Sequence, residues 1–208
     1  MNDNPLANLP RGGRPTRADA TRNRAAILDA ATTLFAAHGA STVSMDAIAA
    51  RAGVGKPTIY RHFGDRAGLA HAVLEEEERA FQERLIHGPA PLGPGTPPGE
   101  RIAAFLDGYL DLVTTHLDLL VAAETARPAA RFEVGAYESY RRLLCLLLGQ
   151  AGVAEHYRGY LADLLLAATA AELVWYQRAV QGRSAAAIRA DAQRFAQKVI
   201  AAYAGDAR

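Results

Sequence analysis

Apolar positions recur at three- and four-residue steps along most of this chain, and no segment after residue 99 shows the alternation typical of a strand. One stripe covers residues 22–38, and Gly39 is placed to end it. A second stripe follows Asp65, a residue suited to capping a helix, and runs over 66–86. Further stripes cover 102–117, 118–126, 133–148, 154–180 and 184–204. The pattern therefore predicts an all-α protein.

Residues 87–99 interrupt the helical pattern. This segment contains five prolines and four glycines, which cannot continue a helix, so it is predicted to form a mobile, exposed loop with irregular order. The acidic run 75–78 lies in the helix before it. Four adjacent carboxylates point all round a helix and cannot converge on one metal ion, so we expect this run to be a solvated face.

Two short amphipathic segments follow each other between residues 44 and 66. Ser44 can cap the first segment, and Gly53 permits the left-handed turn that ends it. The apolar stripe of this segment consists of Ala47, Ile48 and Ala52. The spacing is that of a helix-turn-helix, which places its second helix in a groove of DNA. A tight pair of packing helices with a polar outer face gives the same pattern.

The second short segment carries the candidate contacts. Pro57 stands in its first turn, and helical spacing turns Ile59 and Phe63 inward. The remaining positions divide among the exposed faces: Lys56, Thr58, Tyr60, Arg61 and His62. Such a face of hydrogen-bond donors on a short helix suits a nucleic-acid groove.

At these residues the chain resembles the tetracycline-repressor (TetR/AcrR-like) family of transcriptional regulators. The resemblance is carried by an AxxxGV-like turn at 49–54, a T-[IL]-Y-x-[HY]-F helix at 58–63 and the basic Arg66. It covers residues 22–66, roughly the first quarter of the chain. The resemblance implies three parts: a flexible basic arm over 1–20, a helix-turn-helix DNA-binding domain over 21–66, and a helical effector-binding and dimerisation domain over 67–208.

The resemblance also assigns roles to single residues. Lys56, Pro57 and Thr58 match positions that approach base edges. Four other residues match positions that usually hold phosphates: Ser44, Tyr60, His62 and Arg66. Arg66 departs from the lysine commonest in the family, but it keeps the charge and improves the geometry for phosphate.

Charge is unevenly distributed along the chain, although the formal net charge is only +1. Residues 1–66 hold nine Lys or Arg against five Asp or Glu, whereas the remainder holds fourteen against seventeen. Arg11 and Arg14 belong to a group of five arginines near the N-terminus, which also includes positions 17, 22 and 24. Such an arm can lie along phosphates or in a minor groove, and a solvated tail without contacts is an equal alternative.

The last two stripes, 154–180 and 184–204, can pack internally or dimerise. The resemblance favours a homodimer through these helices, and it also implies a small-molecule effector held in the larger domain. The candidate pocket residues are aromatic side chains that form its walls and charged side chains that select the ligand. The aromatic ones are Phe105, Tyr109, Tyr137, Tyr140, Trp175 and Tyr176, and the charged ones are Glu124, Arg141 and Glu172. Aromatic residues at helical spacing are equally typical of an ordinary core.

Other classes of function find little support. The six histidines show no HxxxH pair, and no glycine loop joins a strand to a helix, so we expect no enzyme, no metal and no cofactor. Cys145 stands among leucines and reads as a small buried hydrophobe. No apolar stretch approaches a membrane span, and we expect a cytoplasmic protein.

The sequence thus predicts a repressor released from a pseudo-palindromic, double-stranded operator by a small molecule. The alternative is an architectural DNA-binding dimer that responds to no effector.

Overall fold

A computed structural model describes residues 17–40, 42–133 and 137–204, and these residues form eleven helices without a strand. The all-α prediction is confirmed. The N-terminal unit comprises α1 (Arg17–His38), α2 (Met45–Ala52), α3 (Lys56–Phe63) and the start of α4 (Arg66–His87). The larger domain adds α5 (Pro98–Thr115), α6 (Leu117–Glu124), α7 (Ala130–Glu133), α8 (Tyr137–Gln150), α9 (Glu155–Ala167), α10 (Ala171–Ala179) and α11 (Ala185–Tyr203).

The N-terminal unit has its own small hydrophobic core. Helix α1 begins at Arg17, earlier than the predicted residue 22, and buries Ile27 and Phe35 against Ile48 of α2 and Ile59 of α3. At the rim of this core, the guanidinium of Arg24 lies 5.5 Å from the centre of the Phe63 ring. Burial of these apolar side chains fixes the position of α3 relative to α1 and α2.

The larger domain is built around α5, which packs against α8, α10 and α11. Its apolar stripe, including Ile102, Phe105 and Leu110, is completely buried. Cys145 is a free, partly buried thiol at the edge of this core, so it is less enclosed than the sequence predicted. No helix in the described part of the chain has the length and apolar character needed to cross a membrane.

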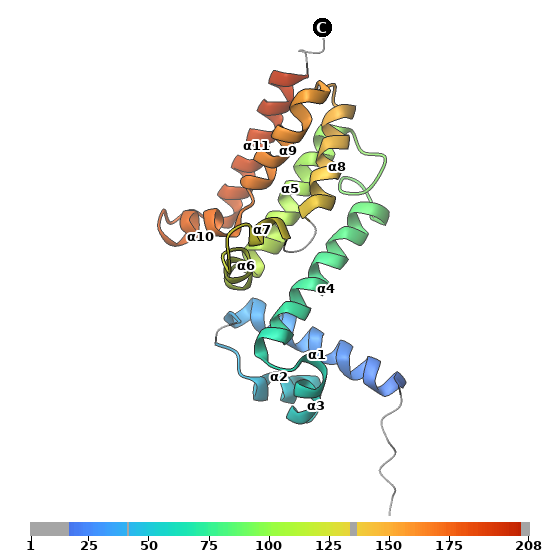
Figure 1. Cartoon of the computed structure of the whole chain (residues 1–208), viewed down its shortest axis with the longest axis vertical. Coiled ribbons are helices and arrows are strands. Elements are labelled where there is room, and N and C mark those ends of the chain that lie inside the picture. The colour runs from blue at the N-terminus through green and yellow to red at the C-terminus, as the bar shows by residue number, and fades with distance from the viewer. Residues whose placement is uncertain (1–16, 41, 134–136, 205–208) are drawn as a thin grey trace, which may run out of the picture.

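Helix α4 belongs to both cores, and Figure 1 shows it running from the N-terminal unit into the larger domain. Leu69 and Val73 pack in the small core, whereas Leu74 and Phe81 pack in the large one. In terms of packing, the boundary between the two units therefore lies within α4, after Val73. A helix of 22 residues spans about 33 Å, so one rigid element connects both cores.

The structure corrects the prediction of one helix over 154–180. Helix α9 ends at Ala167, and α10 starts at Ala171 after a sharp turn. The buried hydroxyl of Thr169 donates to the carbonyl of Leu166 at 2.8 Å, and the N–H of Ala171 donates to the carboxylate of Glu124 at 2.9 Å. The alanine-rich sequence favours a continuous helix, and the long-range contact of Ala171 with Glu124 stabilises the break.

The segment 87–99 follows a defined path, in contrast to the irregular order predicted for it. The guanidinium of Arg101 donates to the carbonyl of Leu85 at 2.6 Å and to that of Leu92 at 3.0 Å. The Leu92 side chain packs against the large core. Arg101 therefore ties this proline-rich connection to the end of α4.

The turn between α2 and α3 depends on Gly53, whose φ of 66° lies in the left-handed region. A Cβ at this position meets nothing within 4 Å, so a substitution acts through the backbone alone. We expect Gly53→Ala to lower the free energy of unfolding by about 1 kcal/mol. Gly53→Asn should cost less, because asparagine tolerates this conformation. Chemical denaturation of the two variants measures the difference, and equal losses would contradict the backbone explanation.

Candidate nucleic-acid interface

Local capping builds the helix-turn-helix as the sequence predicts. The hydroxyl of Ser44 accepts the N–H of Ala47 at 3.1 Å, and the N–H of Val54 closes the end of α2 on the carbonyl of Ala49 at 3.1 Å. The apolar stripe of α2 differs from the prediction, because Ala47 is exposed while Met45 and Ala49 are buried. The buried face of α2 is therefore rotated relative to the predicted one. The side chains on this face are still apolar, so α2 packs against α1 through apolar contacts.

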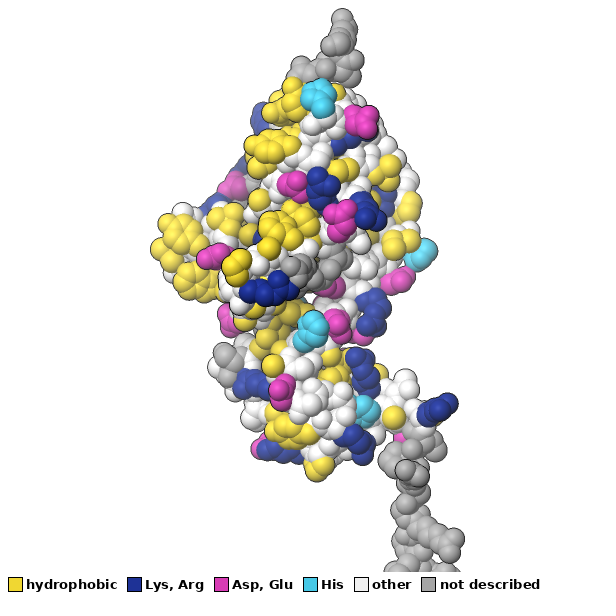
Figure 2. Space-filling view, viewed as in Figure 1, with side chains coloured by type: hydrophobic (Ala, Val, Ile, Leu, Met, Phe, Trp, Pro, Cys, Tyr) yellow, Lys and Arg dark blue, Asp and Glu magenta, His cyan; other side chains and the backbone are white. Residues whose placement is uncertain are grey.

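Helix α3 presents only part of the predicted donor face to solvent. Ile59 is fully buried, which turns Lys56, Pro57 and Tyr60 outward. Arg61 is exposed with them, whereas Thr58 and His62 are half-buried. The exposed residues lie at the end of the molecule opposite the larger domain (Figure 1). Figure 2 shows Lys and Arg side chains gathered at that end.

Lys56, the residue assigned to base reading, is ion-paired within the motif. Its ammonium lies 2.9 Å from the carboxylate of Asp46 on α2, and this hydrogen bond raises the pKa of Lys56. The two side chains are 45% and 70% exposed. An exposed pair of this kind contributes little stability, so Lys56 can exchange Asp46 for an acceptor on DNA at small cost.

The residues assigned to phosphate contacts differ in their access. Tyr60 and Ser44 are exposed, whereas Arg66 and His62 are half-buried, each with one buried nitrogen that has no hydrogen-bond partner among the described residues. Asp65 caps α4 by accepting the N–H of Gly68 at 2.8 Å, as predicted. Arg11 and Arg14 lie outside the described residues.

The predicted ligand residues fall into separate groups. Phe105, Tyr109 and Tyr140 pack with Phe81 of α4 in the large core. Tyr137 and Arg141 of α8 instead meet Asp163 of α9, at 3.1 Å and 2.8 Å, in a surface pocket of about 690 Å³. Glu172, Trp175 and Tyr176 are exposed on α10. The structure therefore does not gather the predicted set in one site.

The side chain of Glu124 is largely buried, with only 8% of it exposed. Its carboxylate is 3.2 Å from the guanidinium of Arg131 and also accepts the N–H of Ala171. Burial raises the pKa of Glu124, whereas Arg131 opposes that shift. This pair holds α6, α7 and the start of α10 together.

Glu78 is a buried residue that sequence reasoning missed. The prediction of a solvated acidic face is wrong at this position, because Glu78 is only 8% exposed. Burial, together with the charges of Glu75 and Glu124, raises the pKa of Glu78 to about 7. Glu78 follows Leu74 by four residues and precedes Phe81 by three, so helical spacing places it on the buried stripe of α4. This spacing was the feature of the sequence that indicated its burial.

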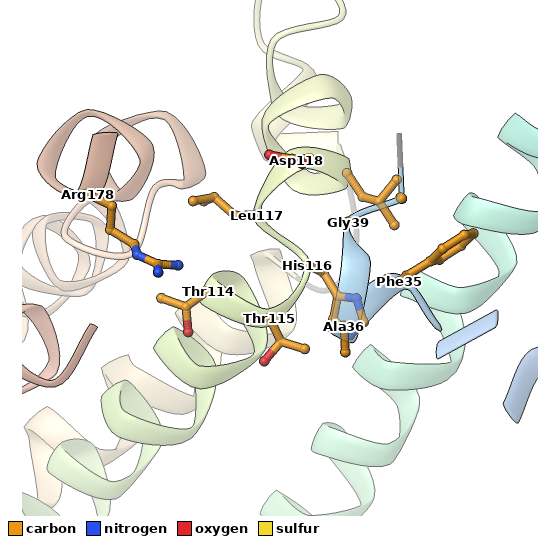
Figure 3. Close-up of a pocket in the computed structure, with 11 residues that line it drawn as sticks. Phe35, Ala36, Gly39, Thr114, Thr115, His116, Leu117, Asp118 and Arg178 are labelled. Atoms are coloured by element: carbon orange, nitrogen blue, oxygen red, sulfur yellow. The ribbon is translucent and has the colours of Figure 1, made fainter. Parts of the chain in front are cut away.

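A second feature absent from the predictions is a pocket of about 200 Å³ where the two units meet (Figure 3). Phe35 and Gly39 from the end of α1 form one side, and Thr114 and His116 from the end of α5 form the other. His116 is buried, which lowers its pKa, and its Nδ1 has no hydrogen-bond partner in the part of the chain that the structure describes. Arg178 of α10 reaches the pocket from the far side.

Comparison with known proteins agrees with this architecture. Residues 27–73 match the family model of bacterial regulatory proteins, tetR family. An HTH-type transcriptional regulator from Staphylococcus aureus strain USA300 is 39% identical over 65 residues, which are 31% of this chain and 35% of that protein. The similarity thus spans about a third of the length of such curated relatives.

Solved structures extend the similarity over most of the chain. A TetR-family transcriptional regulator from Pectobacterium atrosepticum is 26% identical, with 90% of this chain and 97% of that chain covered and a TM-score of 0.65. A putative transcriptional regulator from Saccharomonospora viridis, solved in complex with choline, is 20% identical, with coverages of 85% and 96% and a TM-score of 0.67. At that lower identity the similarity concerns the fold alone.

The exposed position of Lys56 allows a test of base reading. We expect Lys56→Ala to change the preference among DNA sequences, whereas Arg66→Ala should weaken binding to all sequences and lower the salt slope by about one unit. Lys198→Ala is the matched control, because Lys198 is the other lysine of the chain and lies on α11. Selection of bound DNA fragments, with titrations at several salt concentrations, measures both effects. Equal loss of specificity from Lys56→Ala and Arg66→Ala would contradict this division of roles.

The raised pKa of Glu78 predicts an unusual dependence of stability on pH. Between pH 4.5 and about 7 the folded protein holds a proton that the unfolded chain has released, so Glu78 reduces stability as pH rises through this window. Glu78→Gln should therefore be more stable than the wild type at pH 8, by about 2 to 3 kcal/mol, and by less than about 1 kcal/mol at pH 5. Denaturation at the two pH values measures this. Glu76→Gln, which alters a half-exposed partner of Arg79, should change little at either pH.

Proposed function

We propose that this chain, which belongs to the TetR family of bacterial regulatory proteins, is a repressor that binds a pseudo-palindromic operator as a homodimer. In this proposal a small molecule enters the larger domain and releases the protein from DNA. The observation that carries the proposal is the packing of α4, which places Leu69 and Val73 in the core of the DNA-binding unit and Phe81 in the core of the larger domain.

Dimerisation has a physical use for so short a recognition helix. One α3 offers eight residues, and two copies reading neighbouring major grooves double the interface. Large apolar side chains remain exposed on the last helices, including Tyr160 of α9 and Phe195 of α11. Figure 2 shows hydrophobic side chains over this part of the larger domain and at the tip formed by α10. Contact with a second copy would remove this surface from water.

Release of DNA follows from the geometry of a dimer whose half-sites lie about 34 Å apart. A ligand that favours another tilt of α4 moves α3, because Leu69 and Val73 tie α4 to the small core. The two recognition helices then no longer match both half-sites. A ligand acts in this way only if its affinity differs between the two tilts.

The proposed interface predicts the effect of a charge on its surface. Phe195 is 41% exposed, and we expect Phe195→Glu or Leu164→Glu to give monomers that bind operator poorly. Ile86→Glu is the control, since Ile86 is 56% exposed on α4 outside the proposed interface. Sedimentation velocity measures the assembly, and circular dichroism checks that the variants fold. An unchanged dimer in both interface variants would refute the interface.

Ligand response predicts reciprocal coupling between two binding events. Operator DNA should weaken binding of an effector by the same factor as the effector weakens binding of operator, with a coupling of roughly 1 to 3 kcal/mol. Calorimetric titration of an active compound, with and without operator, measures this factor. Identical affinities in both titrations, repeated across a broad chemical screen, would favour the effector-independent architectural dimer.

A further inference from the structure

The side chain of Glu78 is largely buried in the larger domain, and its carboxylate has no partner among the described residues. It is only 8% exposed, on the side of α4 that faces the large core. It forms no hydrogen bond or ion pair with any residue that the structure describes. An ionised carboxylate in such a place is costly unless a positive charge or hydrogen-bond donors accompany it.

The buried cation that acts on Tyr109, Arg131, is already engaged. Arg131 pairs with Glu124 at 3.2 Å, and both side chains are largely shielded from water. The same guanidinium donates to the carbonyl of Leu166. Glu124 and Arg131 therefore neutralise each other. When Glu78 is ionised, it is a buried negative charge with no opposite charge paired to it among the described residues, and a single monovalent cation neutralises it.

Four aromatic rings pack together in the large core, and we call them the aromatic cluster: Phe81, Phe105, Tyr109 and Tyr140. Their ring centres lie 5.0 to 5.9 Å apart. Phe81 follows Glu78 by one helical turn of α4. Burial and the charge of Glu78 both raise the pKa of Tyr109 and of Tyr140, so these hydroxyls lie within reach of its field.

We infer that the effector in the function proposed above is an organic cation with an apolar body, bound between Glu78 and the aromatic cluster. The faces of aromatic rings attract ammonium groups, most strongly where water is excluded, and Glu78 supplies the compensating charge. A metal ion fits poorly, because aromatic faces offer no oxygen or nitrogen ligands. Within the described residues, no group of three His, Cys, Asp or Glu side chains could hold one.

Binding requires the aromatic cluster to open. The rings of Tyr109 and Tyr140 meet edge to face with their centres 5.0 Å apart, which leaves no room for an ammonium group between them. Tyr109 stands on α5 and Tyr140 on α8, whereas Glu78 stands on α4. A cation that parts the two rings and attracts Glu78 therefore shifts α4 relative to α5 and α8. The site thus acts on the helix that carries α3.

The charges that face Glu78 determine how binding depends on pH. Glu75 of α4 and Glu124 of α6 raise its pKa, and Tyr109 and Tyr140 remain neutral near pH 7. The positive charge of Arg131 on α7 is held by Glu124. With a pKa of about 7, the ionised fraction of Glu78 falls from about 0.9 at pH 8 to about 0.1 at pH 6, and affinity for the cation should fall about ninefold.

Two compounds of nearly equal shape test the inference by calorimetry. The first is phenyltrimethylammonium, and the second is its uncharged analogue tert-butylbenzene. The wild type should bind the cation at least tenfold more tightly than the neutral analogue at pH 8. Glu78→Gln should abolish this preference, whereas Glu78→Asp should keep part of it. Glu76→Gln should retain it fully, because Glu76 is half-exposed and pairs with Arg79 on the same helix.

Three results would overturn the inference. The first is equal affinity of the wild type for both compounds, and the second is an undiminished preference in a folded Glu78→Gln variant. The third is failure of the wild type to bind either this cation or tetraethylammonium.

Operator binding, followed by fluorescence anisotropy, separates the two proposals. If the cation binds with the expected preference but leaves operator affinity unchanged, the site is supported and the proposed ligand response fails. If an uncharged compound releases operator while neither cation binds, the ligand response stands and the cationic class is refuted.

Discussion

One helix shared by two cores is the constraint on which this structure depends. Leu69 and Val73 of α4 are completely buried in the small core, and Phe81 is completely buried in the large one. Close-packed cores resist gradual deformation and change between discrete arrangements. A displacement of α4 must therefore repack one core or carry the whole DNA-binding unit with it. In the proposed function, this packing alone carries a signal between the two ends.

Glu78 is the position where α4 departs from its own local pattern. The stripe that includes Leu74 and Phe81 is apolar, yet a carboxylate occupies the buried place between them. Such a residue lowers stability as pH rises from 4.5 to about 7, and structural packing gives no compensation among the described residues. Departures of this kind are expected at functional sites, where an interaction with another molecule offsets the cost.

The sequence predicted those parts of the molecule that local interactions determine. Ser44 and Gly53 mark the two ends of α2 through contacts within four or five residues. The helix-turn-helix was therefore predictable without knowledge of the tertiary structure. The burial of Glu78 and the break after Ala167 depend on partners far along the chain, such as the contact of Ala171 with Glu124. The candidate pocket residues were poorly predicted for the same reason. Helical spacing alone does not distinguish core residues from residues that line a ligand site.

A second contact between the units limits how α4 can move. Leu119 of α6 packs against both cores, and a Cβ on Gly39 of α1 would lie 3.6 Å from the carboxylate of Asp118. His116 is buried beside this contact, in the pocket of about 200 Å³ where the two units meet (Figure 3). A tilt of α4 therefore slides the end of α1 across the turn between α5 and α6. Small side chains at Ala36 and Gly39 leave room for that sliding, whereas the clamp of Arg101 on Leu85 holds the other end of α4. The geometry thus favours rotation of the DNA-binding unit about the far end of α4 over separation of the two units.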